Sequence, residues 1–153
     1  MSDKLEIIEY QEKYKDDFRE ISYQWLNNEG VLEMIDIHII ENFKQVILDG
    51  GHMFFARMGK DIVGTVSLIK VDDETFELAK FGVKEDFQGK RIGTKLIEKC
   101  IETAKAEEGV NKIILSTSSS LEASVYLYRK MGFKEIEDND KYATTDKMFV
   151  MRF

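Results

Sequence analysis

The chain has 153 residues, the usual size of one domain, and 43% hydrophobic, 11% aromatic and 33% charged residues indicate a soluble globular protein. Abundant apolar and aromatic residues argue against intrinsic disorder. The formal net charge of −7 argues against a nucleic-acid binder, because phosphates require a basic surface.

The sequence also excludes some cellular contexts. The single cysteine, Cys100, rules out an internal disulfide. No stretch approaches 18 apolar residues, so we expect no membrane partner. The first residues show neither a basic nor an apolar leader region, so we expect no signal peptide. These features together favour a cytoplasmic protein.

The first half of the chain is expected to contain a strand, two helices and three more strands. Apolar residues at spacings of three and four indicate helices, and short apolar or alternating runs between Gly and Asp turns indicate strands. The expected elements are a strand over 5–10, helices over 13–28 and 37–48 with a loop over 29–36 between them, and strands over 53–58, 62–71 and 75–83. On the last strand, alternation places Phe76 and Leu78 on one face, and Glu77, Ala79 and Phe81 on the other.

The second half opens with the strongest helical pattern of the chain. A continuous apolar stripe predicts a helix over 90–106, followed by a short buried strand over 112–117. A helix over 121–131, ended by Gly132, and closing strands over 133–137 and 147–153 complete the chain. This order predicts one α/β domain over 1–153, with a mixed sheet that carries helices on both faces.

The loop before the 90–106 helix is the most informative stretch. A strand ends near Val83, and a loop containing Gly89 leads into the helix, with Gly93 four residues later. The first turn of a helix has unpaired N–H groups and a positive dipole end, so such a loop is suited to bind phosphate. Neither the P-loop nor the Gly-x-Gly-x-x-Gly pattern is present.

Two segments carry a resemblance to a known family. Residues 88–93, Gln-Gly-Lys-Arg-Ile-Gly, resemble the pyrophosphate loop of the GNAT N-acetyltransferase superfamily, with Arg91 where a glycine is usual. Residues 127–133, Leu-Tyr-Arg-Lys-Met-Gly-Phe, resemble the Leu-Tyr-x-x-x-Gly-Phe signature of the same superfamily. Leu121 and Ser124 stand where that family often has Asn and Ala.

The resemblance implies the GNAT acyl-CoA N-acyltransferase fold and acetyl-CoA as cosubstrate, with no metal. The strand before the loop would splay from its neighbour, and its backbone would hold the pantetheine arm and polarise the thioester. The loop amides would bind the pyrophosphate, and the serine-rich loop 116–120 would offer further polar groups. The implied cofactor-binding residues are Phe81, Gly82, Val83, Gln88, Gly89, Lys90, Arg91, Ile92, Gly93 and Thr94.

Acetyl transfer to an amine requires acid and base groups. A primary amine arrives protonated, so a general base must remove a proton before attack. Glu77, eleven residues before Gln88, resembles the catalytic glutamate of some family members. Glu33, Asp36 or a chain of waters are alternative bases. The family's tyrosine beside the sulfur corresponds to Tyr128, the expected general acid.

The acceptor is the least determined part. The segments 27–38 and 138–146, which would shape the acceptor side, are both acidic. They favour a cationic acceptor, such as a polyamine, an aminoglycoside-like amine or a peptide amine. A homodimer is a family-level expectation. Trp25 is expected in the core at the rim of the acceptor cleft, and Cys100 in the core. His38 and His52 have no metal-ligand spacing.

Two alternatives remain open from the sequence. One is a non-catalytic acyl-CoA-binding or regulatory module on the same fold, which the differences at Arg91, Leu121 and Ser124 would suit. The other is an unrelated α/β interaction domain in which both motifs occur by chance. Binding of CoA would separate the second alternative from the first, and turnover would separate the first from an enzyme.

Overall fold

The computed structural model describes residues 4–28, 34–137 and 147–153, with the side chains at 25–28, 34–36 and 39 excepted. Seven strands form one mixed sheet in the order β1-β2-β3-β4-β5-β7-β6, in which only the β4–β5 contact is parallel. The strands are β1 (Leu5–Glu9), β2 (His52–Met58), β3 (Asp61–Asp72), β4 (Thr75–Val83), β5 (Lys112–Thr117), β6 (Lys134–Ile136) and β7 (Lys147–Arg152). The mixed α/β sheet expected from the sequence is therefore confirmed.

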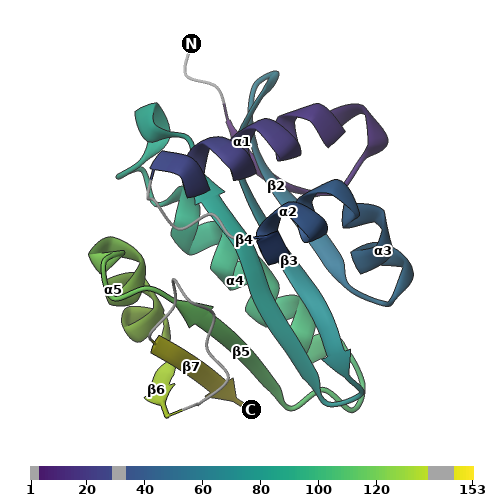
Figure 1. Cartoon of the computed structure of the whole chain (residues 1–153), viewed down its shortest axis with the longest axis vertical. Helices are drawn as coiled ribbons and strands as arrows, with labels where there is room; N and C mark the ends of the chain where they lie inside the picture. Colours follow the sequence, from purple (N-terminus) through teal and green to yellow (C-terminus); the bar gives the residue numbers. More distant parts are fainter. Residues whose placement is uncertain (1–3, 29–33, 138–146) are drawn as a thin grey trace.

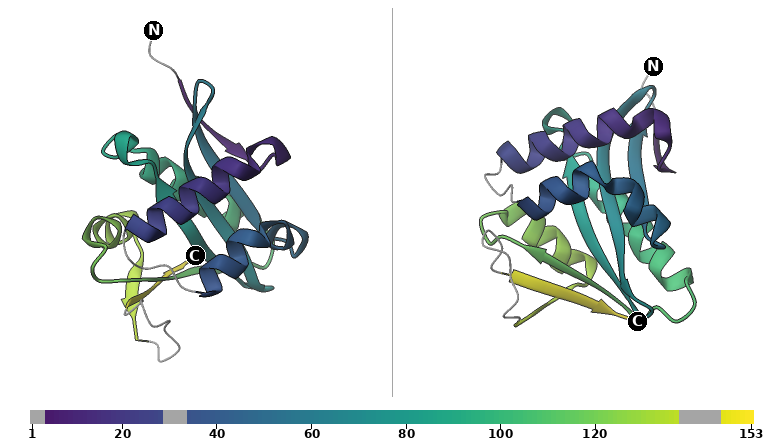
Figure 2. Two further views of the ribbon diagram at one scale, coloured as in Figure 1. Left: turned by 45° about the horizontal axis from the view of Figure 1, so that its top comes forward. Right: turned by 45° about the vertical axis from the view of Figure 1, so that its right-hand side comes forward.

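Helices cover both faces of this sheet (Figures 1 and 2). The helical elements are η1 (Glu12–Tyr14), α1 (Lys15–Asn28), α2 (Met34–Glu41), α3 (Phe43–Leu48), η2 (Glu85–Phe87), α4 (Ile92–Ala106) and α5 (Glu122–Met131). Helices α1 to α3 pack on one face, and α4 and α5 pack on the other. No helix within the described ranges combines the length and the apolar character that a membrane crossing requires.

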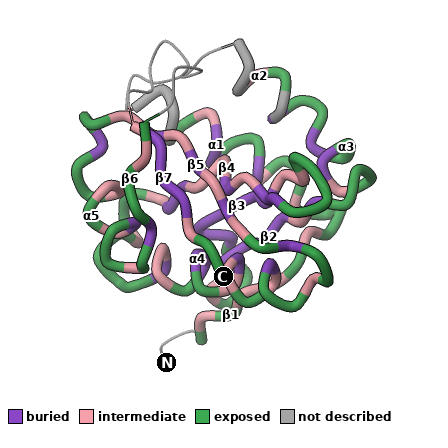
Figure 3. Tube along the Cα trace, turned by 90° about the horizontal axis from the view of Figure 1, so that it is seen from below, coloured by how far each residue is buried: buried purple, intermediate pink, exposed green. Residues whose placement is uncertain are grey.

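Each layer has its own apolar core (Figure 3). The larger core lies between the sheet and α4 and α5, and it includes Cys100 as expected. In the smaller core, the fully buried ring of Phe18 packs edge-on against Phe43, with ring centres 5.3 Å apart, and near Phe55 at 6.5 Å. These rings attach α1 and α3 to the sheet, because each aromatic side chain buries a large apolar area.

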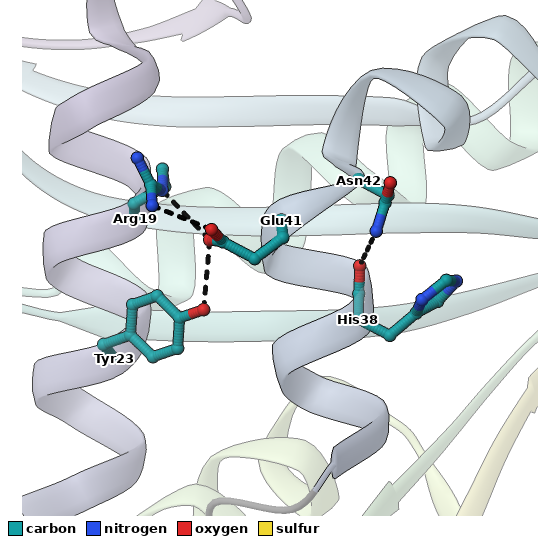
Figure 4. Close-up of polar contacts among 5 residues, drawn as sticks. All are labelled: Arg19, Tyr23, His38, Glu41 and Asn42. Atoms are coloured by element: carbon teal, nitrogen blue, oxygen red, sulfur yellow. Dashed lines mark hydrogen bonds and ion pairs between the residues drawn. The ribbon is translucent and has the colours of Figure 1, made fainter.

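The helix expected over 37–48 is two helices, and the loop expected over 29–36 ends earlier. The backbone of Asn42 leaves helical geometry, with φ −119° and ψ 32°. Its side-chain amide donates to the carbonyl of His38 at 2.8 Å (Figure 4). The same carbonyl also accepts the backbone N–H of Asn42 at 3.0 Å, so the side-chain bond adds to the last helical hydrogen bond, and the change in the Asn42 backbone ends the helix. The chain is already helical from Met34 onward.

A polar contact joins the two helices on either side of the segment 29–33. The guanidinium of Arg19 donates to both carboxylate oxygens of Glu41, at 3.0 and 2.8 Å, and the Tyr23 hydroxyl donates to the same carboxylate at 3.0 Å (Figure 4). Burial, together with this hydrogen bond, raises the pKa of Tyr23. The contact is largely exposed, so it orients α2 against α1 more than it stabilises the fold.

The face assignment on β4 is wrong at Phe81. Ser67 pairs with Ala79, but Thr65 pairs with Gly82, so β4 contains one extra residue between these positions. Lys80, with φ 51°, lies in this β-bulge. Glu77 and Ala79 share the face that α1 covers, whereas Phe81 turns to the opposite face and approaches Tyr128. Phe76 and Leu78 share a face as expected.

Replacing Phe18 tests the contribution of the smaller core. Phe18→Ala should lower the free energy of unfolding by about 3–5 kcal/mol, because it removes a buried ring and leaves a cavity. Glu41→Gln, which weakens an exposed ion pair, should cost far less than Phe18→Ala. Urea denaturation of both variants measures these values. A loss below about 1 kcal/mol for Phe18→Ala would show that the ring is not a main support of α1.

Candidate active site

β4 and β5 separate where the site begins. Their parallel contact covers three register positions, Thr75–Lys112, Phe76–Ile113 and Glu77–Ile114. Beyond Glu77, β4 continues alongside β3, while β5 continues alongside β7, and the two strands diverge (Figure 1). On the edge of β4 that faces β5, the register with β5 therefore ends at Glu77, and Leu78, Ala79, Phe81, Gly82 and Val83 lie beyond it.

The loop after β4 is held to the sheet at both ends. The Lys84 N–H donates to the carbonyl of Val63 at 2.8 Å, and the Gln88 side-chain amide donates to the carbonyl of Val83 at 3.1 Å. Gly89 has a positive φ of 80°, and a Cβ there would meet nothing within 4 Å. The loop thus leaves open space above its glycine.

Arg91 sets the start of α4. Its backbone is left-handed, with φ 65° and ψ 16°, so the helix begins at Ile92 and not at Lys90 as expected. The pyrophosphate loop of the GNAT superfamily usually has glycine at this position. The left-handed backbone explains that preference, because glycine adopts it without a Cβ clash. No side chain caps the end of the helix, so the N–H groups of its first turn are available to a ligand.

Gly93 allows three elements to meet. A Cβ at this position would lie 2.8 Å from Cζ of Phe81 on β4 and 3.3 Å from Cδ2 of Leu127 on α5. Any larger residue would push β4 or α5 away from the first turn of α4. The second glycine of the motif is therefore a packing requirement of this site.

These elements enclose a cleft of about 540 Å³ between the start of α4 and α5. Of the cofactor residues expected from the sequence, it brings together Phe81, Val83, Gln88, Gly89, Arg91, Ile92, Gly93 and Thr94. Gly82 and Lys90 do not line it. Ser120, Leu121 and Ser124 do, but the largely buried side chain of Leu121 offers the cleft no polar group in place of the family's asparagine.

Sequence reasoning missed part of the wall. Phe87, Glu122, Ala123, Tyr126 and Leu127 also line the cleft. The 127–133 motif placed α5 near the site, and the spacing of Ala123 and Leu127 by four residues indicates one helix face. What the sequence did not show is which face of α5 turns toward α4.

Tyr128 lies directly behind the cleft and does not line it. Its ring is buried among Phe81, Phe133 and Phe149, with centres 6.2, 6.0 and 6.2 Å away. Burial, with a smaller contribution from Cys100, raises the pKa of the Tyr128 hydroxyl well above its ordinary value. The hydroxyl therefore stays protonated at neutral pH.

Glu77 lies on the α1 side of the sheet, where β4 and β5 last touch. Its neighbours across the strands are Ile69 on β3 and Ile114 on β5. Burial between these apolar residues raises the pKa of the Glu77 carboxyl, and the charge of Lys80 opposes this only in part. A partly desolvated carboxylate with a raised pKa is a better proton acceptor than an exposed one.

The other candidates do not join this site. Glu33 lies outside the described residues, as do residues 138–146, and the side chains of Trp25 and Asp36 are not described. His38 is exposed on α2, and His52 on β2 lies 4.0 Å from Glu107. In the described part of the chain, no three His, Cys, Asp or Glu side chains are grouped so that they could hold a metal ion.

Comparisons with known proteins point in one direction. The model of the Acetyltransferase (GNAT) family matches residues 6–133. A probable N-acetyltransferase, camello, of Xenopus laevis is 33% identical over 106 residues, which are 67% of this chain and 46% of the relative. An uncharacterized N-acetyltransferase of Chlorobaculum tepidum is 32% identical over 98 residues, 64% of this chain and 57% of the relative. The chain thus spans about half the length of these two relatives.

A solved structure agrees over the whole chain. An acetyltransferase of the GNAT family from Staphylococcus aureus Mu50 has a TM-score of 0.88 and 28% sequence identity to this chain. The match covers 97% of this chain and 99% of that one. The fold, including the order of strands around the cleft, is therefore the one that this family uses.

The left-handed backbone at Arg91 gives a testable consequence. Arg91→Gly should raise the free energy of unfolding by about 0.5–1 kcal/mol, because glycine adopts this geometry without a Cβ clash. The gain is smaller than the full strain, since glycine has more conformational entropy in the unfolded chain. Arg91→Ala should give no such gain, because alanine keeps the Cβ. Chemical denaturation of the two variants without ligand separates backbone strain from any effect of the arginine charge. Equal stability of the two would contradict the strain.

Proposed function

The chain belongs to the GNAT acetyltransferase family, and on that premise we propose that it transfers an acetyl group from acetyl-CoA to a primary amine. The observation that carries this proposal is the cleft between α4 and α5, which the start of α4 and the end of β4 line. The backbone amides at the start of α4 are suited to bind a pyrophosphate. The edge of β4 is suited to pair with the amide groups of the pantetheine arm.

The cosubstrate would follow the cleft from its phosphates to its thioester. The amides of Gly89 and of Arg91 to Thr94 would receive the pyrophosphate, because these residues line the cleft at the start of α4. The Gln88 N–H already donates to the carbonyl of Glu85 at 3.2 Å. The pantetheine amides would pair with the β4 edge. An N–H between Phe81 and Val83 would then donate to the thioester carbonyl and stabilise the charge that develops there.

Glu77 is the proposed base. The amine nitrogen attacks the thioester carbonyl carbon, and Glu77 accepts the proton that the nitrogen loses, directly or through one water. Its position beside the point where β4 and β5 separate supports this role, because the thioester would lie in the same gap. Its raised pKa brings its basicity closer to what a proton transfer near neutral pH requires.

Tyr128 is the proposed acid. As the tetrahedral intermediate collapses, the C–S bond breaks and the thiolate of CoA leaves with the bonding electrons. The Tyr128 ring lies 6.2 Å from the ring of Phe81, which lines the cleft, and its hydroxyl would give its proton to that sulfur. Glu77 and Tyr128 thus belong to opposite faces of the sheet, and the gap between β4 and β5 is the place where both would reach one substrate.

The proposed acceptor is a cationic amine. The chain is acidic overall, and the segments 27–38 and 138–146 contain six acidic residues, Glu29, Glu33, Asp36, Asp138, Asp140 and Asp146, against one lysine, Lys141. A negative surface favours the approach of a positively charged substrate. Polyamines, aminoglycoside-like amines and the lysine or N-terminal amine of a peptide are the candidates.

Ligand binding and turnover test the proposal together. Acetyl-CoA or CoA at about 100 times its dissociation constant should stabilise the protein by about 2.7 kcal/mol, a shift of about 5–10 °C in Tm, while ATP and NADH should give none. Free thiol should then be released when acetyl-CoA and spermidine, an amino sugar or a lysine peptide are supplied.

The possible results separate the alternatives. Binding without turnover on any amine would favour a non-catalytic acyl-CoA module. If neither acetyl-CoA nor CoA at millimolar concentration shifted Tm, there would be no basis for an acetyltransferase or for an acyl-CoA-binding module. If neutral or acidic amino acids were the best acceptors, the cationic preference would be wrong.

The pH dependence tests Glu77. Because the base must be ionised, kcat at saturating acceptor should fall as the pH drops through the raised pKa of Glu77, which lies above the ordinary value of 4.5. Glu77→Gln should lower kcat by about 10²–10⁴-fold and remove this acid limb. Stopped assays from pH 4.5 to 9 measure both effects.

A stability measurement controls for a purely structural role. A raised folded-state pKa gives a contribution that is present below the unfolded pKa and lost as the pH rises through the folded one. Glu77→Gln should therefore stabilise the protein more at pH 8 than at pH 4. A variant that keeps the acid limb of wild type would rule out Glu77 as the base.

A further inference from the structure

Tyr126 is an exposed aromatic residue at the edge of the cleft. Its side chain is 68% exposed, on a helix whose neighbouring residues Leu127 and Tyr128 pack inward. Within the described part of the chain, no ring or cation packs on it. By contrast, Phe153, the other exposed aromatic residue there, lies under the Lys105 ammonium, which is 5.7 Å from the ring centre.

The spacing along α5 places Tyr126 at the outer lip. Ala123 and Leu127 form the inner stripe of the helix, and Leu127 reaches toward Gly93 on α4. Glu122 and Tyr126, also four residues apart, form the next stripe outward and still line the cleft. A phosphate held at the start of α4 would therefore have the Tyr126 ring on the opposite wall, nearer to solvent.

The ligand's chemistry matches this arrangement. If the thioester lies at Phe81 and the pyrophosphate at the start of α4, the adenosine must continue outward, away from the β4 end of the cleft. It then reaches the lip, where a flat purine needs an apolar surface and keeps its polar edges in water. Phe87 also lines the cleft, but the Lys90 ammonium lies 5.3 Å from its ring centre and occupies one of its faces.

We propose that the ring of Tyr126 stacks on the adenine of the cosubstrate, so that this residue selects for the nucleotide end of CoA. This inference rests on the proposed use of acetyl-CoA and adds a contact that the loop amides do not make. Tyrosine has a large apolar ring and a hydroxyl that can stay in water. It therefore suits a site that is exposed to water when empty and only partly covered when adenine is bound.

A binding cycle with shortened ligands tests the contact. Calorimetry compares CoA, dephospho-CoA, which keeps the adenine but lacks the 3′-phosphate, and 4′-phosphopantetheine, which lacks the adenosine. Tyr126→Ala should weaken the binding of CoA and dephospho-CoA by about 5- to 150-fold, the size expected for one base on one aromatic ring. It should leave 4′-phosphopantetheine binding as in wild type, and Tyr126→Phe should bind all three ligands nearly as well as wild type.

Matched controls make each result decisive. Phe153→Ala removes an exposed ring that does not line the cleft and should change no affinity. Circular dichroism shows that each variant is folded. An equal loss for all three ligands, or no loss for CoA, would overturn the stacking contact while leaving the acetyltransferase proposal in place. Wild-type protein that binds none of the three ligands would overturn both.

Discussion

β4 and β5 pair at three positions and then separate, because β4 stays with β3 while β5 follows β7. Past Glu77, β4 therefore borders a cleft whose other walls are the start of α4 and one face of α5. The cleft, the loop and the positions of both proposed catalytic residues all follow from this separation.

The bulge at Lys80 gives β4 two different roles along its length. Before it, alternation keeps Glu77 and Ala79 on the face covered by α1, and isoleucines on both neighbouring strands desolvate the Glu77 carboxyl. After it, Phe81 turns to the other face and fills the space between Gly93, Leu127 and Tyr128. One extra residue therefore allows a single strand to turn the Glu77 carboxyl to one face of the sheet and the Phe81 ring to the other.

The cleft has different chemistry at its two ends. At its inner end, the buried ring of Tyr128 and the tight contact at Gly93 leave little room for motion. At its outer end, Gly89 leaves open space, Arg91 is exposed and Tyr126 has no described packing partner on its ring. A rigid inner end positions reacting atoms, and an open outer end admits a long ligand at little cost. This difference between the two ends suits acetyl-CoA, which has a small reactive thioester at one end and a large nucleotide at the other.

The sequence by itself determined the fold class, the order of the elements and the two segments that meet at the cleft, because hydrophobic periodicity and glycine positions are local signals. It also identified most of the loop residues that line the site. It did not predict the break at Asn42 or the start of α4 at Ile92, since the backbone geometry of Asn42 and the left-handed backbone of Arg91 decide these. Nor did it reveal the bulge that turns Phe81 away from Glu77, or the face of α5 that brings Tyr126 to the lip. Those features depend on register between strands and on packing between helices, and alternation within one segment cannot encode either of them.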